Sequence, residues 1–160
     1  MARPMPIRSP AVLFVCLGNI CRSPLAEAAF RARAEATGLA VTIDSAGTGD
    51  WHAGEPPDRR AQATARRYGI DISGYRARQV APGDFGRFTH VFALDDSVLT
   101  SLRRVAPPGA TARLGLLLDL VKGSEGQSVA DPYYGGLDGF ETTWRQVDAA
   151  AAALVERLRG

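Results

Sequence analysis

Residues 12–24 read Val-Leu-Phe-Val-Cys-Leu-Gly-Asn-Ile-Cys-Arg-Ser-Pro, an apolar run that leads into a short turn. The apolar part, residues 12–17, predicts a buried β-strand. Ser23 followed by Pro24 predicts a helix with Ser23 as its N-cap and Pro24 as its first residue. The turn therefore joins a strand to a helix, and the backbone N–H groups at such a helix N-terminus can bind an anion.

Two chemically active side chains flank this turn, Cys16 at its start and Arg22 at its end. A thiol at a helix N-terminus beside an arginine ionises readily, and the thiolate is a nucleophile. The planar guanidinium of arginine matches two oxygens of a phosphate group. Alone, a strand cysteine is usually a small buried hydrophobe and a loop arginine is usually solvated. The five-residue spacing and the following helix favour instead a loop that holds both a nucleophile and a phosphate cradle.

The loop resembles the C-x5-R-S signature of the low-molecular-weight protein tyrosine phosphatase family, and residues 16–23 carry the resemblance. The resemblance implies that Cys16 attacks phosphotyrosine and forms a phosphocysteine, while Arg22 stabilises the phosphate oxygens. It also implies that the Ser23 hydroxyl donates a hydrogen bond to the thiolate. The backbone N–H groups that would bind phosphate belong to Leu17, Gly18, Asn19, Ile20, Cys21 and Arg22.

A second motif, Asp131-Pro132-Tyr133-Tyr134, supplies a candidate general acid. Pro132 biases Asp131 toward an extended conformation, so that the carboxylate projects from its loop. Protonation of a leaving phenolate is typically worth ~10²–10⁴ in rate. Alone this stretch is a turn, but it resembles the family's Asp-Pro-Tyr loop. The resemblance implies that Asp131 acts first as the acid and then as the base toward the water that hydrolyses the phosphocysteine.

The resemblance extends to supporting positions. It implies that Asn19 shapes the loop in a left-handed conformation, which few other residue types tolerate, and that Ser45 holds Asn19 in place. Four aromatic or imidazole side chains would wall a slot for a phenyl phosphate: Trp51, His52, Tyr133 and Tyr134.

One position departs from the family, which usually has histidine where this chain has Tyr75. In the family that histidine belongs to a buried network with two carboxylates, which match Glu27 and Asp44 here. Because two adjacent carboxylates should not both ionise, we expect a shared proton or a raised pKa, with the Tyr75 hydroxyl as hydrogen-bond donor.

Strand-like and helix-like segments alternate along the chain. The predicted strands are residues 12–17, 40–45 and 89–94, the predicted helices are 24–37, 58–68, 95–105 and 138–159, and 113–120 is a strand or a strand–helix junction. This order predicts an α/β fold: a single-domain doubly wound sheet of four parallel strands with helices on both faces, flavodoxin-like. Ligands of such sheets bind beyond the carboxyl ends of the strands, where the Cys16 loop lies. We expect residues 1–10 to be a flexible tail and 11–160 a single phosphatase domain.

The composition excludes several classes of protein. The chain has 160 residues, 46% of them hydrophobic and 22% charged, which is ordinary for a globular domain and unlike disordered or fibrous chains. A net charge of +2 with no DNA-binding motif argues against nucleic acid as a partner. The cluster of arginines over residues 59–78 is interpreted as a solvated face that could steer acidic phosphopeptides. No apolar run approaches the length of a membrane span.

Only two cysteines occur, Cys16 and Cys21, and both lie in the loop. This usage indicates a reducing cytoplasm, and two cysteines cannot build a tetrahedral zinc site, so we expect neither a metal nor another cofactor. The apolar run near the N-terminus has no cleavage site of the kind that follows a signal peptide. Cys21 is either a packing residue or a redox partner that traps oxidised Cys16 as a disulfide.

Three alternatives to a tyrosine phosphatase remain. Arsenate reductases of this fold need cysteines downstream of Cys21, and this chain has none. Protein arginine phosphatases of the family carry threonine where Ile20 stands, so Ile20 and the paired tyrosines favour an aryl substrate. A phosphate-binding module without turnover would need neither Cys16 nor Asp131. We therefore expect tyrosine-phosphorylated proteins as substrates, inorganic phosphate as product and inhibitor, and a monomer.

Overall fold

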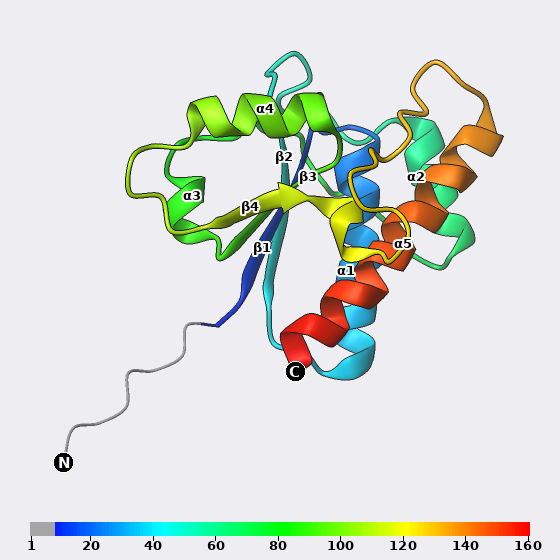
Figure 1. Cartoon of the computed structure of the whole chain (residues 1–160). Helices are drawn as coiled ribbons and strands as arrows, with labels where there is room; N and C mark the ends of the chain where they lie inside the picture. The colour runs from blue at the N-terminus through cyan, green and yellow to red at the C-terminus, as the bar shows by residue number, and fades with distance from the viewer. Residues whose placement is uncertain (1–8) are drawn as a thin grey trace.

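The computed structural model describes residues 9–160, and its centre is a four-stranded parallel sheet with strand order β2-β1-β3-β4 (Figure 1). All six residues of β1 are buried, as expected of a central strand covered on both faces. The predicted fold class is confirmed. The strands are β1 (Ala11–Cys16), β2 (Thr42–Gly47), β3 (His90–Ala93) and β4 (Arg113–Leu116).

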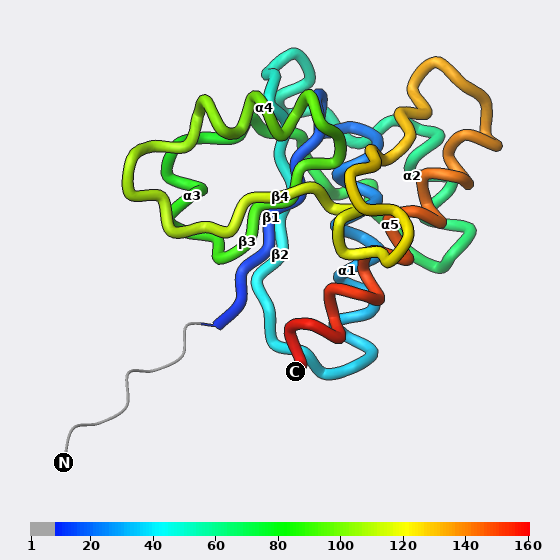
Figure 2. Tube along the Cα trace, in the orientation of Figure 1, coloured from blue at the N-terminus to red at the C-terminus, as the bar shows by residue number. Residues whose placement is uncertain are grey.

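Helices cover both faces of the sheet, as the tube in Figure 2 also shows. One face carries α1 (Arg22–Thr37), α2 (Arg59–Arg67) and α5 (Leu137–Arg159); the other carries α3 (Asp84–Arg87) and α4 (Asp96–Val105). Side chains of β1 alternate between the two cores, because successive strand residues point to opposite faces. Val12 and Phe14 pack toward α1 and α5, whereas Leu13 and Val15 pack toward α3 and α4.

The predicted tail falls largely on residues 1–8, which lie outside the described residues. Pro10 is already tied to the sheet, because its carbonyl accepts a hydrogen bond from the Thr42 N–H at 3.1 Å. Among residues 9–160, no helix combines the length and apolarity that crossing a bilayer requires.

Two details of the predicted elements were wrong. Helix α1 begins at Arg22 and has Cys21 as its N-cap, so Ser23 lies inside the first turn and does not cap it. The short helix α3 was not predicted, since a single turn gives too few residues for a helical period. The ambiguous segment 113–120 is β4 followed by the 3₁₀-helix η1 (Leu117–Leu120).

Candidate active site

Cys16 is the last residue of β1, so its side chain lies where the strand ends and the loop begins. Its Sγ lies 3.0 Å from Ser23 Oγ and accepts a hydrogen bond from the Asn19 N–H at 3.2 Å. Because Ser23 does not cap α1, its hydroxyl is available to this sulfur. When Cys16 is a thiolate, Ser23 is the donor, and both contacts stabilise the negative charge.

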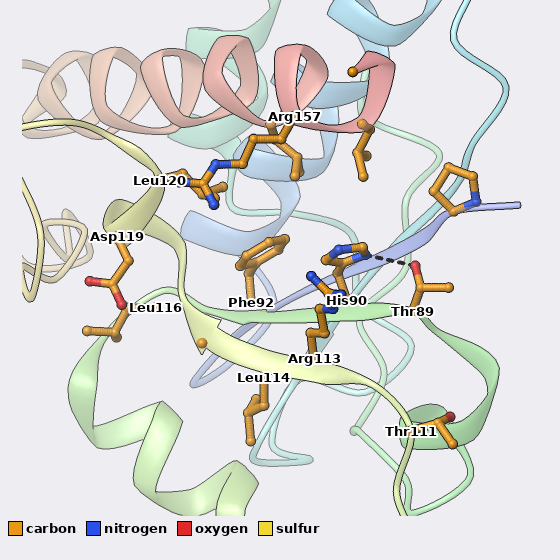
Figure 3. A pocket seen from close by; sticks show the side chains of 15 residues that line it. Thr89, His90, Phe92, Thr111, Arg113, Leu114, Leu116, Asp119, Leu120 and Arg157 are labelled. Atoms are coloured by element: carbon orange, nitrogen blue, oxygen red, sulfur yellow. Dashed lines mark hydrogen bonds between the residues drawn. The ribbon is translucent and has the colours of Figure 1, made fainter. Parts of the chain in front are cut away.

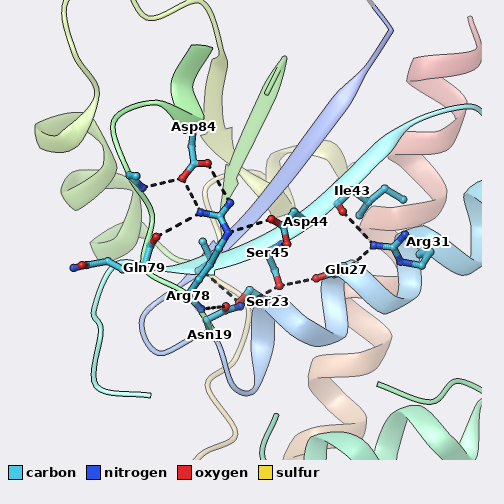
Figure 4. Close-up of polar contacts among 12 residues, drawn as sticks. Asn19, Ser23, Glu27, Arg31, Ile43, Asp44, Ser45, Arg78, Gln79 and Asp84 are labelled. Atoms are coloured by element: carbon cyan, nitrogen blue, oxygen red, sulfur yellow. Dashed lines mark hydrogen bonds and ion pairs between the residues drawn. The ribbon is translucent and has the colours of Figure 1, made fainter. Parts of the chain in front are cut away.

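Asn19 has the left-handed conformation that the sequence predicted, with φ of 58°, and is the one non-glycine residue of the described chain with positive φ. Its Nδ2 donates to Ser23 Oγ at 2.8 Å and to Ser45 Oγ at 3.0 Å. Its Oδ1 accepts from the Arg78 N–H at 3.0 Å. Asn19 therefore joins the loop to β2 and to the segment before α3 (Figure 4).

Each of the two carboxylates beneath the loop is paired with its own arginine (Figure 4). Glu27 accepts from Ser45 Oγ at 2.7 Å and from Arg31, one helical turn further along α1, at 2.8 Å. Asp44 pairs with Arg78 at 3.1 Å. These arginines supply the positive charge that we assumed was missing without a histidine, so the contacts do not favour the shared proton, which was one of the two expected alternatives.

One part of that expectation holds. Burial raises the pKa of Glu27, although the hydrogen bonds from Ser45 and Arg31 oppose the rise. Tyr75 lies beside both Arg31 and Glu27, and its own pKa is raised by burial and then by the charge of Glu27. The hydroxyl of Tyr75 thus remains protonated next to this network.

Arg22 is 4% exposed and is held by a carboxylate that sequence reasoning missed. Its NH1 lies 2.6 Å from Asp95 Oδ2, and its NH2 lies 3.7 Å from Asp131 Oδ2. Burial would lower the pKa of Arg22, but the Cys16 sulfur and the bond to Asp95 outweigh it and raise the pKa. The signal for Asp95 was its position just beyond the carboxyl end of β3, separated from it by Leu94 alone, at the same sheet edge as Cys16.

The predicted slot exists as a pocket of about 210 Å³ over Cys16. It is smaller than the roughly 300–1,000 Å³ of pockets for drug-sized ligands, which suits a single phenyl phosphate. Tyr134 is 95% exposed and Trp51 67% exposed, so both form its outer rim. The predicted residues that line it are Cys16, Leu17, Gly18, Ile20, Cys21, Arg22, Trp51, His52, Asp131, Tyr133 and Tyr134.

Arg60 connects the loop that carries Asp131 to the loop between Cys16 and Arg22. It donates to the carbonyl oxygens of Tyr133 at 2.8 Å and Gly135 at 2.9 Å, and it pairs with Asp58 at 3.0 Å. The Asp58 N–H in turn donates to the Ile20 carbonyl at 2.9 Å. Arg60 and Arg78, which the sequence placed on a solvated arginine face, are partly exposed and in addition hold these specific contacts.

Cys21 is a free, buried thiol. Burial, followed by the charges of Asp58 and Cys16, raises its pKa far above the usual range of a thiol. The thiol of Cys21 is thus protonated at neutral pH.

The comparisons with known proteins agree with this geometry. The family model for "Low molecular weight phosphotyrosine protein phosphatase" matches residues 11–160. The chain belongs to this family. It is 48% identical over 151 residues to the low molecular weight protein-tyrosine-phosphatase YfkJ of Bacillus subtilis, covering 93% of this chain and 96% of that one.

Two solved structures are similar to this chain over most of its length. A protein tyrosine phosphatase from Entamoeba histolytica superposes with a TM-score of 0.89 at 33% identity, covering 94% of this chain and 97% of that one. A Drosophila arginine phosphatase gives a TM-score of 0.88 at 30% identity, covering 93% and 98%.

Proposed function

We propose that the protein hydrolyses phosphotyrosine in proteins through a phosphocysteine on Cys16. The observation that supports this most is the meeting of three groups in one pocket: the Cys16 sulfur, the Arg22 guanidinium and the Asp131 carboxylate. A binding module would need the arginine and the loop N–H groups, but neither the nucleophile nor the acid.

In the first step the Cys16 thiolate attacks phosphorus in line with the leaving phenol oxygen. The sulfur–phosphorus bond forms as the phosphorus–oxygen bond breaks, and protonated Asp131 gives its proton to the phenolate. Arg22 and the loop N–H groups hold the three equatorial oxygens, because phosphoryl transfer depends mostly on positioning and charge stabilisation.

In the second step the Asp131 carboxylate removes a proton from a water molecule that attacks the phosphocysteine. The sulfur–phosphorus bond breaks and inorganic phosphate is released. The Ser23 hydroxyl and the Asn19 N–H stabilise the departing thiolate through the contacts that they make with Sγ. Inorganic phosphate should rebind to the empty loop and inhibit competitively.

The aromatic wall supports an aryl substrate over phosphoarginine. Trp51 and Tyr134 stand at the rim, Tyr133 packs edge-on against Tyr134 with ring centroids 4.9 Å apart, and Ile20 places an apolar side chain at the pocket. A phenyl ring can stack on these surfaces. We further propose that the protein acts as a monomer on cytoplasmic phosphoproteins.

The test measures turnover of phosphotyrosine and phosphoarginine peptides by the parent, without added metal. Cys16→Ser should lose turnover, because the hydroxyl is a far weaker nucleophile. Asp131→Asn should lower turnover of phosphotyrosine by ~10²–10⁴. Asp138→Asn, an exposed acid in the first turn of α5, is the matched control and should leave turnover unchanged.

Four outcomes would contradict the proposal. Turnover by Cys16→Ser would exclude the phosphocysteine, and unchanged turnover by Asp131→Asn would exclude the general acid. Preference for phosphoarginine would change the substrate class. Tight binding of phosphotyrosine without any turnover by the parent would favour the binding module.

A further inference from the structure

A second and larger recess, of about 820 Å³, lies against the edge strand β4 (Figure 3). Its base is formed by β3 and β4, with His90 and Phe92 from β3, and its wall by the last turns of α5, with Arg157 and Leu158. It shares no lining residue with the pocket over Cys16. The two are therefore separate places on the molecule.

Gly115 keeps this recess open. A Cβ added to Gly115 would meet no atom within 4 Å, and its φ is not among the positive values of the described glycines. Its neighbours Leu114 and Leu116 pack into the core beneath α4, so a side chain at 115 would point the other way, into the recess. Glycine weakens a strand, and neither the backbone conformation nor crowding requires glycine at position 115. What the missing side chain of Gly115 preserves is the open space of the recess.

Two arginines and one aspartate among the side chains that line the recess leave it with a net positive charge. Arg113 lies on β4 and Arg157 on α5, and within residues 9–160 neither guanidinium forms an ion pair. Asp119 is the acidic side chain in the lining, and its Oδ1 already accepts a hydrogen bond from the Gly126 N–H at 2.7 Å. Burial and then Arg113 lower the pKa of His90, so the permanent charge at neutral pH comes from the two arginines.

Apolar surface accompanies this charge. The rings of His90 and Phe92 lie nearly parallel, with centroids 5.9 Å apart, and leucines from η1 and α5 border them. An ion alone would use only the arginines, whereas a flat apolar body could also cover Phe92 and fill the space above Gly115.

We propose that this recess binds an organic carboxylate, with its anionic head between Arg113 and Arg157 and its apolar body over Gly115 and Phe92. Guanidinium groups form strong, charge-assisted hydrogen bonds with carboxylates. The proposal does not depend on the phosphatase reaction, because it concerns other residues and is tested without turnover.

The experiment is a titration of the ¹⁵N-labelled full chain with 2-naphthoate, followed by backbone amide shifts in NMR spectra. We expect saturable shifts at Gly115, His90 and Leu158. Acetate has the head without the body, and 2-naphthamide has the body without the charge, so each should bind at least about tenfold more weakly. Equal binding of either compound, or shifts confined to the Cys16 loop, would overturn the proposal.

Variants test the site itself. Arg113→Gln and Arg157→Gln should each weaken binding of 2-naphthoate by about tenfold, as expected when a charge-assisted hydrogen bond is lost. Arg145→Gln, on the same helix but outside the recess, should bind like the parent. If Arg113→Gln and Arg157→Gln both bound 2-naphthoate like the parent, the placement of the carboxylate between these two arginines would be refuted.

Gly115→Leu tests the proposed position of the ligand's apolar body, because the leucine side chain would fill the recess above position 115. We expect this variant to keep the parent's NMR spectrum elsewhere and to lose binding by at least tenfold. Full affinity in the folded variant would contradict the proposal. If Gly115→Leu does not fold, Gly115→Val, whose side chain is smaller and suited to a strand, should show the same loss.

Discussion

Replacing Asn19 with alanine should destabilise the protein by about 3–4 kcal/mol. The side chain makes three hydrogen bonds, two as donor and one as acceptor, within a buried network. Each such bond contributes about 1 kcal/mol net. Alanine must also adopt a φ of 58°, and that left-handed conformation costs ~1 kcal/mol more. For a chain of this size the midpoint of thermal unfolding should fall by roughly 10 °C.

A matched variant separates the two contributions. Asn19→Gly removes the same hydrogen bonds, but glycine tolerates positive φ. We therefore expect Asn19→Gly to be more stable than Asn19→Ala by ~1 kcal/mol. The assay is urea denaturation at pH 7, with the free energy of unfolding extrapolated to water and the slope compared between variants.

A double-mutant cycle with Ser45→Ala tests whether the hydrogen bonds are the cause. Because Ser45 accepts one of the bonds from Asn19, the cost of Asn19→Ala should be smaller in the Ser45→Ala background. The reasoning would be refuted if Asn19→Ala lost less than ~0.5 kcal/mol, which is the range of ordinary surface substitutions. It would also be refuted if the glycine variant were no more stable than the alanine variant.

Three further predictions concern Arg60, Cys21 and Glu27. Arg60→Met should lower kcat for phosphotyrosine by about tenfold, and should lower kcat for nitrophenyl phosphate less, because nitrophenolate is a better leaving group and needs the general acid less. The control Arg59→Met should change kcat for neither substrate. An equal loss of kcat for both substrates would argue against a role of Arg60 through the loop that carries Asp131. After treatment with peroxide and then with a reductant, the parent should regain activity and Cys21→Ser should not. Because the pKa of Cys21 is raised, the rate of disulfide formation should increase as the pH rises. Full recovery of activity by the variant would exclude the disulfide. Because the pKa of Glu27 is raised in the folded state, its contribution to stability is fully present below the pKa of an unfolded glutamate and is lost as the pH rises through the folded pKa. Denaturation curves should therefore show that the stability of the parent falls relative to that of Glu27→Gln as the pH rises from about 4.5. A difference in stability that stays constant with pH would contradict this prediction.

The sequence predicted the sheet and the loop because their signals are local. The apolar run before Cys16 and the motif at Asp131 are each contained in a few neighbouring residues, and parallel strands bring their carboxyl ends to one edge. The N-cap was assigned to Ser23 from a local preference. The loop instead begins the helix at Arg22, which leaves the Ser23 hydroxyl to the sulfur.

The missed residues are those whose role depends on distant partners. Asp95 is 73 positions from Arg22, and Arg60 is 73 positions from Tyr133, so no local pattern joins either pair. Arg31 was different: it stands four residues after Glu27 in a predicted helix, and that spacing favours an ion pair. Applying that rule would have removed the expectation of a shared proton.

Asp95 explains why Arg22 is oriented before any substrate arrives. Its Oδ1 accepts the Val98 N–H at 2.7 Å and so caps α4, while its Oδ2 holds Arg22 NH1 at 2.6 Å. The cap fixes the carboxylate at the start of α4, two residues beyond the end of the inner strand β3. The guanidinium therefore keeps NH1 engaged and presents NH2 toward Asp131 and the pocket. Because this donor is positioned by the fold and not by the ligand, it need not reorganise when charge develops on a phosphate, which is the condition under which electrostatic stabilisation is most effective.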